Sequence, residues 1–256
     1  MFLSFRQLSA ALFTAGALFL VVHSGRAQDA KPNDAAKPFQ RMDAGAKKLH
    51  ETFLERAKKG GVDVLFIGDS ITQGWGGSGK KVWAERFDKM NAANFGIGGD
   101  RTQHVLWRIT EGKELEGIDP KVIVMMIGTN NFGSNTAEQI AEGVKVIVAE
   151  FHKQKPKAKL LLLGVFPRGG KNPKDFKDPM VAAKDERNVK SKGVNDIISK
   201  LDDGKTVKYL DITEKFLDDK GGLAKTLMPD FLHLSEKGYT IWADAVQKPI
   251  EEMMKK

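Results

Sequence analysis

The sequence predicts an α/β protein, a three-layer α/β/α sandwich with about five parallel strands in a single domain. Short apolar runs alternate with longer amphipathic stretches along most of the chain, which is the order expected of strands and crossover helices. Two of the runs, VIVMMI and LLLLGVF, are apolar on both faces, as strands buried between two helix layers require. No internal repeat interrupts this alternation.

The chain begins with a segment typical of export. Arg6 supplies a positive charge, residues 7–22 are mostly apolar, and residues 25–27 place small residues where a signal peptidase reads. The apolar run falls short of the roughly 20 residues of a spanning helix, which disfavours the alternative of a retained membrane anchor. We expect residues 1–27 to be a cleaved signal peptide. The mature protein would then be exported, periplasmic or extracellular, without stable membrane insertion.

The remaining elements follow in order. Residues 28–40 are polar and aperiodic and predict a linker, and residues 41–256 form the domain. Its first helix spans Arg41 to Lys59 and ends at two glycines. The expected strands are Val62–Ile67, Ala92–Phe95, Val122–Ile127, Leu160–Phe166 and Val207–Leu210. The expected helices are Trp83–Met90, Thr102–Thr110, Ala137–Phe151, Val189–Leu201 and Glu236–Met254, the last of them broken at Pro249.

Composition excludes several classes of function. The chain has no cysteine, so disulfides, thiolate–metal sites and a cysteine nucleophile are excluded. The formal charge is +8, and removal of residues 1–27, which hold two arginines and no acid, lowers it to +6. The lysines are scattered and no nucleic-acid-binding motif is present, so nucleic acid is not an expected partner.

Three predicted strands are each followed by a loop that contains glycine and a small polar residue. Gly68-Asp69-Ser70 follows the first, Gly96-Ile97-Gly98-Gly99-Asp100 the second, and Gly128-Thr129-Asn130-Asn131 the third. Ligands of an open parallel sheet bind outside the carboxyl ends of its strands. The three loops therefore predict a single site at one rim of the sheet.

Ser70 and His233 are the predicted nucleophile and general base. A serine between a strand and a helix projects its hydroxyl over the rim, although a helix-capping serine is the commoner reason for that position. Asp230 precedes His233 by three residues, so one turn places both side chains on the same side. A base with an orienting carboxylate is what a serine nucleophile needs. His104 is the one rival base, and we interpret it as a satisfied interior or rim histidine.

An ester hydrolase also needs donors for the developing oxyanion. The backbone N–H groups of Ser70 and Gly99 and the side-chain amide of Asn130 are the predicted donors. Glycine suits such a position because no side chain blocks the approach of substrate to the backbone. The alternatives are an ordinary turn glycine and an ordinary turn asparagine.

These residues together resemble the four sequence blocks of the SGNH (GDSL) hydrolase family. Gly68-Asp69-Ser70, Gly99, Gly128-Thr129-Asn130 and Asp230-x-x-His233 occur in the family's order. The stretches NFGIGGDRTQHVLWRI, PKVIVMMIGTNN, LLLGVFPRG and DFLHLSEKGY are especially similar to the intracellular platelet-activating-factor acetylhydrolase catalytic (beta/gamma) subunits within it. The similarity runs from about Val62 to the C-terminus.

The resemblance implies a flavodoxin-like sandwich, no metal and no cofactor. It also implies Ser70, His233 and Asp230 as the catalytic residues and Ser70, Gly99 and Asn130 as the oxyanion hole. The subunits that resemble this chain pair as dimers, so a homodimer is a further expectation. The chain departs from that subgroup in a longer stretch at residues 168–188 and in its export signal.

The expected function is therefore that of a secreted serine esterase. Neighbours of the catalytic residues, Ile71, Thr129 and Leu232, would form the acyl pocket, and their size favours a small acyl group such as acetyl. An exported enzyme meets O-acetylated carbohydrates, which are the expected substrates; lipid esters, cleaved by a lysophospholipase or acetylhydrolase, are the alternative. A non-catalytic carbohydrate-binding module on the same fold is an alternative of another class. A dinucleotide loop at residues 96–99 is disfavoured because Arg101 stands where its third glycine belongs.

Overall fold

A computed structural model of the chain describes residues 1, 32–169, 180–181 and 186–255. The described residues from Asn33 onward belong to one compact unit. Its main sheet has five parallel strands in the spatial order β2-β1-β3-β4-β6. They are β1 (Val64–Gly68), β2 (Ala92–Gly96), β3 (Val122–Met126), β4 (Lys159–Leu163) and β6 (Val207–Leu210). The prediction of an α/β fold with about five parallel strands is confirmed.

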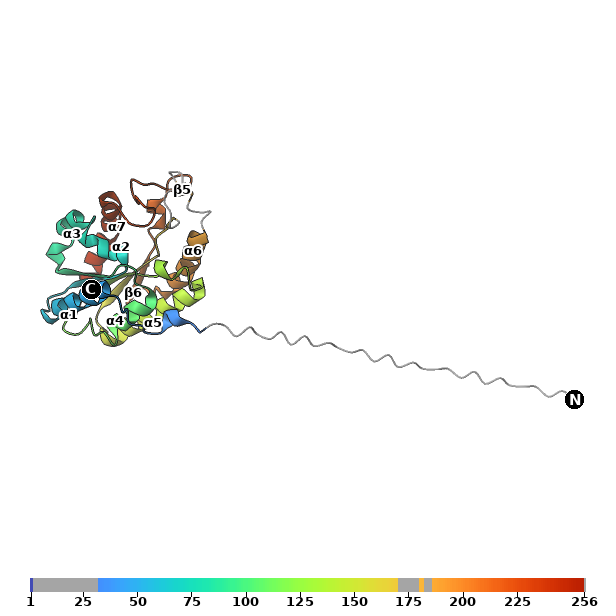
Figure 1. Cartoon of the computed structure of the whole chain (residues 1–256), viewed down its shortest axis with the longest axis horizontal. Helices are drawn as coiled ribbons and strands as arrows, with labels where there is room; N and C mark the ends of the chain where they lie inside the picture. Colours follow the sequence, from blue (N-terminus) through green and yellow to red (C-terminus); the bar gives the residue numbers. More distant parts are fainter. Residues whose placement is uncertain (2–31, 170–179, 182–185, 256) are drawn as a thin grey trace. The chain divides into compact units, whose positions relative to one another are not determined.

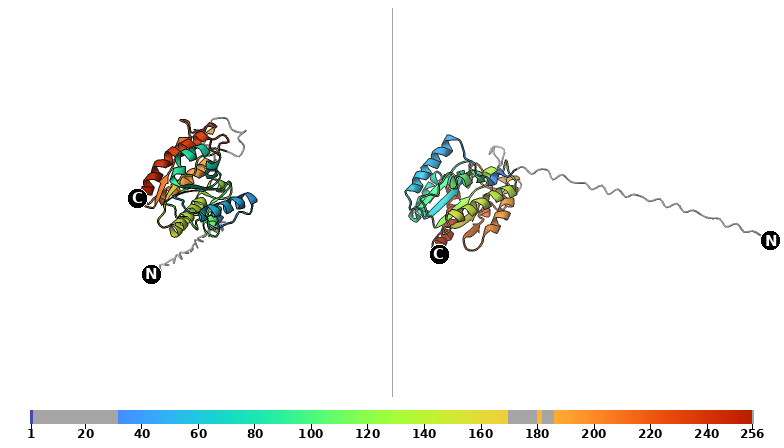
Figure 2. Two further views of the ribbon diagram at one scale, coloured as in Figure 1. Left: turned by 90° about the vertical axis from the view of Figure 1, so that its left-hand side faces the viewer. Right: turned by 90° about the horizontal axis from the view of Figure 1, so that it is seen from below.

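Helices cover both faces of the sheet, which makes three layers (Figure 1). One face carries α1 (Ala44–Lys58), α4 (Thr102–Ile109), α5 (Ala137–Gln154) and α6 (Glu186–Ile198). The other carries α2 (Ser70–Gln73), α3 (Lys80–Arg86) and α7 (Glu236–Lys255). Successive β1 side chains enter opposite cores, Leu65 and Ile67 the first, Val64 and Phe66 the second. This two-residue alternation is why the strands are apolar throughout. The two further views in Figure 2 show the same helices on the two sides of the sheet.

Local capping decides where the helices begin. Asp43 caps α1, because its Oδ1 accepts a hydrogen bond of 2.9 Å from the Ala46 N–H. The helix therefore starts at Ala44, three residues later than predicted, and Arg41 lies outside it. Thr136 and Gln139 form a capping box at the start of α5.

The structure differs from expectation at two places. The expected break at Pro249 does not occur, because α7 continues through it to Lys255. A proline removes one helical hydrogen bond, and the fully buried Ile250 keeps the following turn packed on the core. A second, antiparallel sheet pairs β5 (Met180–Val181) with β7 (Gly222–Leu223), and neither strand was predicted because a two-residue strand shows no readable alternation.

The segment expected to be a linker is packed on the domain where the structure describes it. Asp34–Ala36 form a 3-10 turn, and Ala35 is fully buried. The Ala35 carbonyl accepts a hydrogen bond of 2.7 Å from the Thr102 hydroxyl, and the Asn33 amide donates to the Gln139 carbonyl at 3.1 Å. The expected signal peptide, apart from Met1, lies outside the described residues. No described helix has the length and apolar character needed to cross a membrane.

Candidate active site

Ser70 lies at the carboxyl end of β1, at the first position of α2. The turn before it is tight: a Cβ added to Gly68 would lie 2.4 Å from the Met126 carbonyl oxygen, so no other residue fits. Asp69 caps α2, its Oδ1 accepting from the Ile71 N–H at 2.9 Å. The Tyr239 hydroxyl, from α7, donates to the Ile71 carbonyl at 2.6 Å. These contacts fix the position of Ser70 from both sides.

The structure brings Ser70, His233 and Asp230 together as a chain of hydrogen bonds. Ser70 Oγ lies 2.9 Å from His233 Nε2, although the two residues are 163 positions apart. His233 Nδ1 lies 2.6 Å from Asp230 Oδ2. This geometry allows the imidazole to take a proton from the serine while the carboxylate stabilises the imidazolium.

Asp230 is held by its own loop as well as by the ring. Its Oδ1 accepts the backbone N–H groups of Leu232 at 3.0 Å and His233 at 2.7 Å. Partial burial raises the pKa of Asp230, but the hydrogen bonds from His233 and Leu232 and the nearby imidazole outweigh it, so the pKa lies below its usual value. The carboxylate is therefore ionised at neutral pH, as an orienting partner of the histidine must be.

The predicted oxyanion donors lie on the loops after β1, β2 and β3. Gly99 has φ of +82°, a conformation that favours glycine, and its backbone N–H has no acceptor among the described residues. The Asn130 side-chain amide donates one hydrogen to the Asp100 carbonyl at 2.9 Å. A primary amide has two such hydrogens, and the second has no acceptor among the described residues.

A buried ion-pair network holds the loop that carries Gly99. Asp100 is fully buried and binds two arginines, Arg108 at 2.8 Å and Arg41 at 3.1 Å. Arg41 also donates to the Gly98 carbonyl, and Arg108 pairs with the buried Glu114 at 2.8 Å. Buried charges are tolerated only when paired in this way. The network therefore positions the predicted oxyanion loop.

Asp69 is a buried acid beside the nucleophile. It is fully buried, and its Oδ2 has no hydrogen-bond partner among the described residues. Burial raises the pKa of Asp69 to about 7, aided by the charge of Asp100 and opposed chiefly by the hydrogen bond from Ile71. A substantial fraction of this carboxyl is therefore protonated at neutral pH.

The three residues predicted to form the acyl pocket lie around the catalytic residues. Ile71 and Thr129 are only 2% and 3% exposed, and Leu232 is half-buried. Ile71 and Leu232 pack in the core beneath α7. Arg168, buried in the segment that follows β4, donates to the Thr129 hydroxyl at 3.1 Å. Residues 170–179 and 182–185 of the longer stretch at 168–188 lie outside the described residues.

His104 does not compete as the base. Its Nδ1 accepts the Arg101 N–H at 3.0 Å at the start of α4. Burial and the nearby Arg41 and Arg101 charges lower the pKa of His104 to about 4. The ring is thus neutral and weakly basic at pH 7, which agrees with its interpretation as a satisfied rim histidine.

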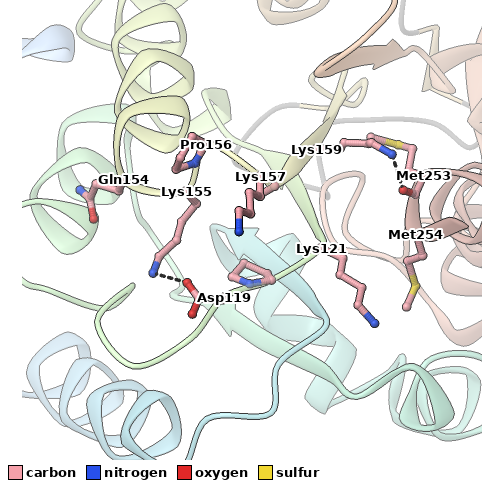
Figure 3. A pocket seen from close by; sticks show the side chains of 11 residues that line it. Asp119, Lys121, Gln154, Lys155, Pro156, Lys157, Lys159, Met253 and Met254 are labelled. Atoms are coloured by element: carbon pink, nitrogen blue, oxygen red, sulfur yellow. Dashed lines mark hydrogen bonds and ion pairs between the residues drawn. The ribbon is translucent and has the colours of Figure 1, made fainter. Parts of the chain in front are cut away.

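A lysine-lined hollow, drawn in Figure 3, lies at the amino ends of β3 and β4. It holds about 490 Å³ beside the residues that lead into β3 and β4, with Lys121, Lys157 and Met254 among its lining. Lys155 in the same hollow pairs with Asp119 at 3.0 Å. Since it lies at the amino ends of the strands, this hollow is not part of the candidate site.

Within the described ranges, no group of three or more acidic or histidine side chains is placed to hold a metal ion.

Sequence reasoning missed two residues of the site. Gln73 accepts the Gly98 N–H on its Oε1 at 2.7 Å, and its place one helical turn after Ser70 was a usable signal. Arg41 reaches Gly98 and Asp100 from nearly 60 positions away, so no local pattern pointed to it.

A parallel sandwich with a serine, a histidine and an acid in contact at its carboxyl rim defines a class, the serine ester hydrolases. Comparison with known proteins gives the family. The model of the GDSL-like lipase/acylhydrolase family matches residues 66–241, and the chain belongs to this family. It is a carboxylic ester hydrolase. This excludes the two alternatives of a non-catalytic binding module and a dinucleotide-binding protein.

Relatives and a solved structure agree with this assignment. Platelet-activating factor acetylhydrolase IB subunit alpha1 of Bos taurus is 37% identical over 215 residues, 83% of this chain and 86% of that protein. Subunit alpha2 of Rattus norvegicus is 40% identical over 206 residues, 80% of this chain and 81% of that one. A GDSL-like lipase from Bacteroides thetaiotaomicron has a similar fold, with a TM-score of 0.59 at 20% identity, over 81% of this chain and 97% of that one.

Proposed function

We propose that the enzyme removes a small acyl group, acetyl above all, from an ester by way of an acyl-enzyme formed on Ser70. The observation that carries the proposal is the hydrogen-bonded chain from Ser70 Oγ through the His233 ring to Asp230, at 2.9 and 2.6 Å. Few arrangements other than nucleophilic catalysis need a serine, an imidazole and a carboxylate in this order.

The reaction has two balanced halves. Ser70 Oγ bonds to the ester carbonyl carbon while His233 Nε2 takes the hydroxyl proton, and the same proton then passes to the leaving alcohol as the C–O bond breaks. A water molecule next attacks the acyl-enzyme, again giving its proton to His233, which returns it to Ser70 as the acid leaves. Asp230 keeps the imidazolium stable through both halves.

The N–H groups of Ser70 and Gly99 and the amide of Asn130 hold the tetrahedral oxyanion. The positive φ of Gly99 supports this role, as does its N–H group, which has no acceptor in the part of the chain that the structure describes. So does the hydrogen bond from Asn130 to the Asp100 carbonyl, which fixes the amide beside the same loop. Donors set before the reaction lower the barrier because they need no reorganisation.

The small acyl group is proposed from the residues around Ser70. Ile71 follows Ser70 directly and Thr129 precedes Asn130; both are almost completely buried, and Leu232, next to His233, is half-buried. The names of the acetylhydrolase relatives point the same way. A chain-length series of nitrophenyl esters tests it: acetyl should be cleaved fastest, and a preference for octanoyl would contradict the proposal.

An O-acetylated carbohydrate remains the substrate class we propose, and export to the periplasm or cell exterior is part of the same proposal. A lipid ester is the second candidate, because the curated relatives are acetylhydrolases named for a lipid mediator. Acetate release from panels of acetylated sugars and lipids separates the two. N-terminal sequencing of the exported protein tests cleavage after Ala27, and light scattering tests the homodimer that we expect from the sequence.

The catalytic assignment is tested with Ser70→Ala and a matched control, Ser199→Ala, at a serine whose hydroxyl donates to the Asp196 carbonyl of its own turn. Ser70→Ala should lose turnover and labelling by a fluorophosphonate probe while its thermal unfolding stays close to that of the parent. Ser199→Ala should keep both. Turnover or labelling retained in Ser70→Ala would refute the assignment.

A further inference from the structure

A groove of about 570 Å³ has Ser70 in its wall. We call it the Gln73 groove. The apolar side chains Leu49 and Phe53 of α1 line one side, Gln73 and the glycines that follow α2 line another, and Asn94 of β2 lines a third. The groove lies at the free edge of the sheet, since β2 is the outermost strand on that side. It is much larger than an acetyl group requires.

The lining carries no charge among the described residues. It consists of two apolar side chains, two amides, the nucleophile and four glycines. Phe53 stacks on Phe95 with ring centroids 4.6 Å apart, which holds the apolar side in place. A charged ligand group would lose hydration here without gaining a partner. The groove therefore suits an uncharged group with both apolar and hydroxyl surfaces.

The side-chain amides of Asn94 and Gln73 differ in how many of their hydrogen-bonding groups are still free to bind a ligand. Asn94 is engaged at both ends, donating to the Gln73 carbonyl at 3.3 Å and accepting the Gly96 N–H at 3.0 Å. Gln73 uses its Oε1 for the Gly98 N–H at 2.7 Å, and its Nε2 donates to no described acceptor. That bond also fixes the Nε2 next to the predicted oxyanion loop, so Gln73 offers two donor hydrogens beside Ser70.

The groove and the acyl side lie against different residues. The proposed acyl side is closed by Ile71 and Thr129, neither of which lines the groove. An ester whose small acyl group fills the closed side must place its larger alcohol part elsewhere. Among the described residues, the Gln73 groove is an open space that shares Ser70 and has room for that part.

We infer that the Gln73 groove binds the alcohol part of the ester and selects an uncharged, hydroxyl-bearing alcohol of about monosaccharide size, with Gln73 Nε2 donating to one of its oxygens. The inference rests on the proposed function, since it needs Ser70 as the nucleophile. It makes Gln73 a positioning residue that decides between substrates.

The first test fills the groove. A Cβ at Gly76 meets nothing within 4 Å, so Gly76→Leu introduces a side chain without a clash. Gly133→Leu is the matched control, because its Cβ is equally free and Gly133 does not line the groove. For each variant, kcat/KM is measured for a monoacetylated methyl glucopyranoside and for ethyl acetate.

Gly76→Leu should lower kcat/KM for the acetylated glucoside at least tenfold while ethyl acetate changes less than twofold. Gly133→Leu should leave the ratio of the two substrates unchanged. Equal loss on both substrates, or none on either, would overturn the inference. So would a loss that follows acyl length in a nitrophenyl series, because the groove would then hold the acyl part.

The second test removes the donor. Gln73→Met keeps the side-chain length and the lack of charge but loses the amide. Its kcat/KM for the acetylated glucoside should fall about tenfold further than for ethyl acetate, mostly through KM, because ethyl acetate has no hydroxyl to bind. A parallel fall on both substrates would show that Gln73 only supports Gly98, and would overturn the inference. If Ser70→Ala kept its activity, the proposed function itself would have failed, which is a separate result.

Discussion

Replacing Asp230 by Asn isolates the contribution of the carboxylate charge to catalysis. The Asn side-chain oxygen can still accept the backbone N–H groups of Leu232 and His233, now bonded to Asp230 Oδ1 at 3.0 and 2.7 Å. The loop should therefore keep its shape. What is lost is the negative oxygen that lies 2.6 Å from His233 Nδ1 and that stabilises the imidazolium formed in the transition state.

The magnitude follows from the exposure of the pair. Two unit charges about 4 Å apart attract by about 1 kcal/mol in water and about 4 kcal/mol at an effective dielectric constant of 20. The side chains of His233 and Asp230 are 46% and 43% exposed, so solvent screens them and a value of about 2 kcal/mol is appropriate. That corresponds to about 30-fold in rate. Loss of the correct ring tautomer adds to it, and we expect kcat to fall roughly 100- to 1,000-fold, short of the ~10,000-fold loss in buried triads.

The assay is steady-state hydrolysis of nitrophenyl acetate. Asp218→Asn is the matched control, because Asp218 accepts two backbone N–H groups of its own turn in the same way, at 2.9 and 2.7 Å. The control should keep full activity. A loss below about threefold in Asp230→Asn would refute the orienting role of the carboxylate, and a loss of 10,000-fold or more would refute the argument from solvent screening.

Three further variants test the oxyanion site, the ion pairs of Arg108 with Asp100 and Glu114, and the buried acid Asp69. Asn130→Ala should lower kcat about 100-fold or more with little change in KM; a negligible loss in steady-state assays would make Asn130 a turn residue. Arg108→Met leaves Asp100 and Glu114 buried without their shared partner and should cost about 3–5 kcal/mol in urea unfolding; a cost below about 1 kcal/mol would contradict the network. Because the pKa of Asp69 is raised to about 7 in the fold, the folded state binds more protons than the unfolded state between about pH 4 and 7, and this acid lowers stability as pH rises through that window. Asp69→Asn should therefore be no more stable than the parent near pH 4 and more stable by up to about 4 kcal/mol at pH 8, whereas an advantage independent of pH would exclude the titration of Asp69 as its cause.

Much of the fold could be predicted because local hydrophobic patterns in the sequence indicate where the strands and helices lie. The run VIVMMI is apolar at every position, and β3 occupies Val122–Met126 within it. The alternation of such runs with amphipathic stretches predicted the parallel sheet and its two helix layers. The errors fall where local pattern is weak: β5 has two residues, and Pro249 lies inside a helix whose burial outweighs the loss of one hydrogen bond.

The place of the site was also predictable. Strands in a parallel sheet end at the same edge, so glycine and polar residues after β1, β2 and β3 had to share a rim. The spacing of Asp230 and His233 predicted their contact, because residues three positions apart in one turn place their side chains on the same side. The roles of these residues in catalysis remain predictions that the variants above test.

The sequence by itself determined the family, the order of elements, the rim that carries the polar loops, and the pairing of His233 with its acid. Only the tertiary structure decided that His233 lies 2.9 Å from Ser70. The same holds for the contacts of Arg41 and Arg108 with the Gly98–Asp100 loop. It holds too for the complete burial of Asp69 and for the place of Gln73 beside an uncharged groove. The reason is physical. Periodicity and turn chemistry act between residues a few positions apart. Burial, ion pairing and the shape of a cavity depend instead on segments that are dozens of residues apart in the sequence and come into contact only in the folded chain.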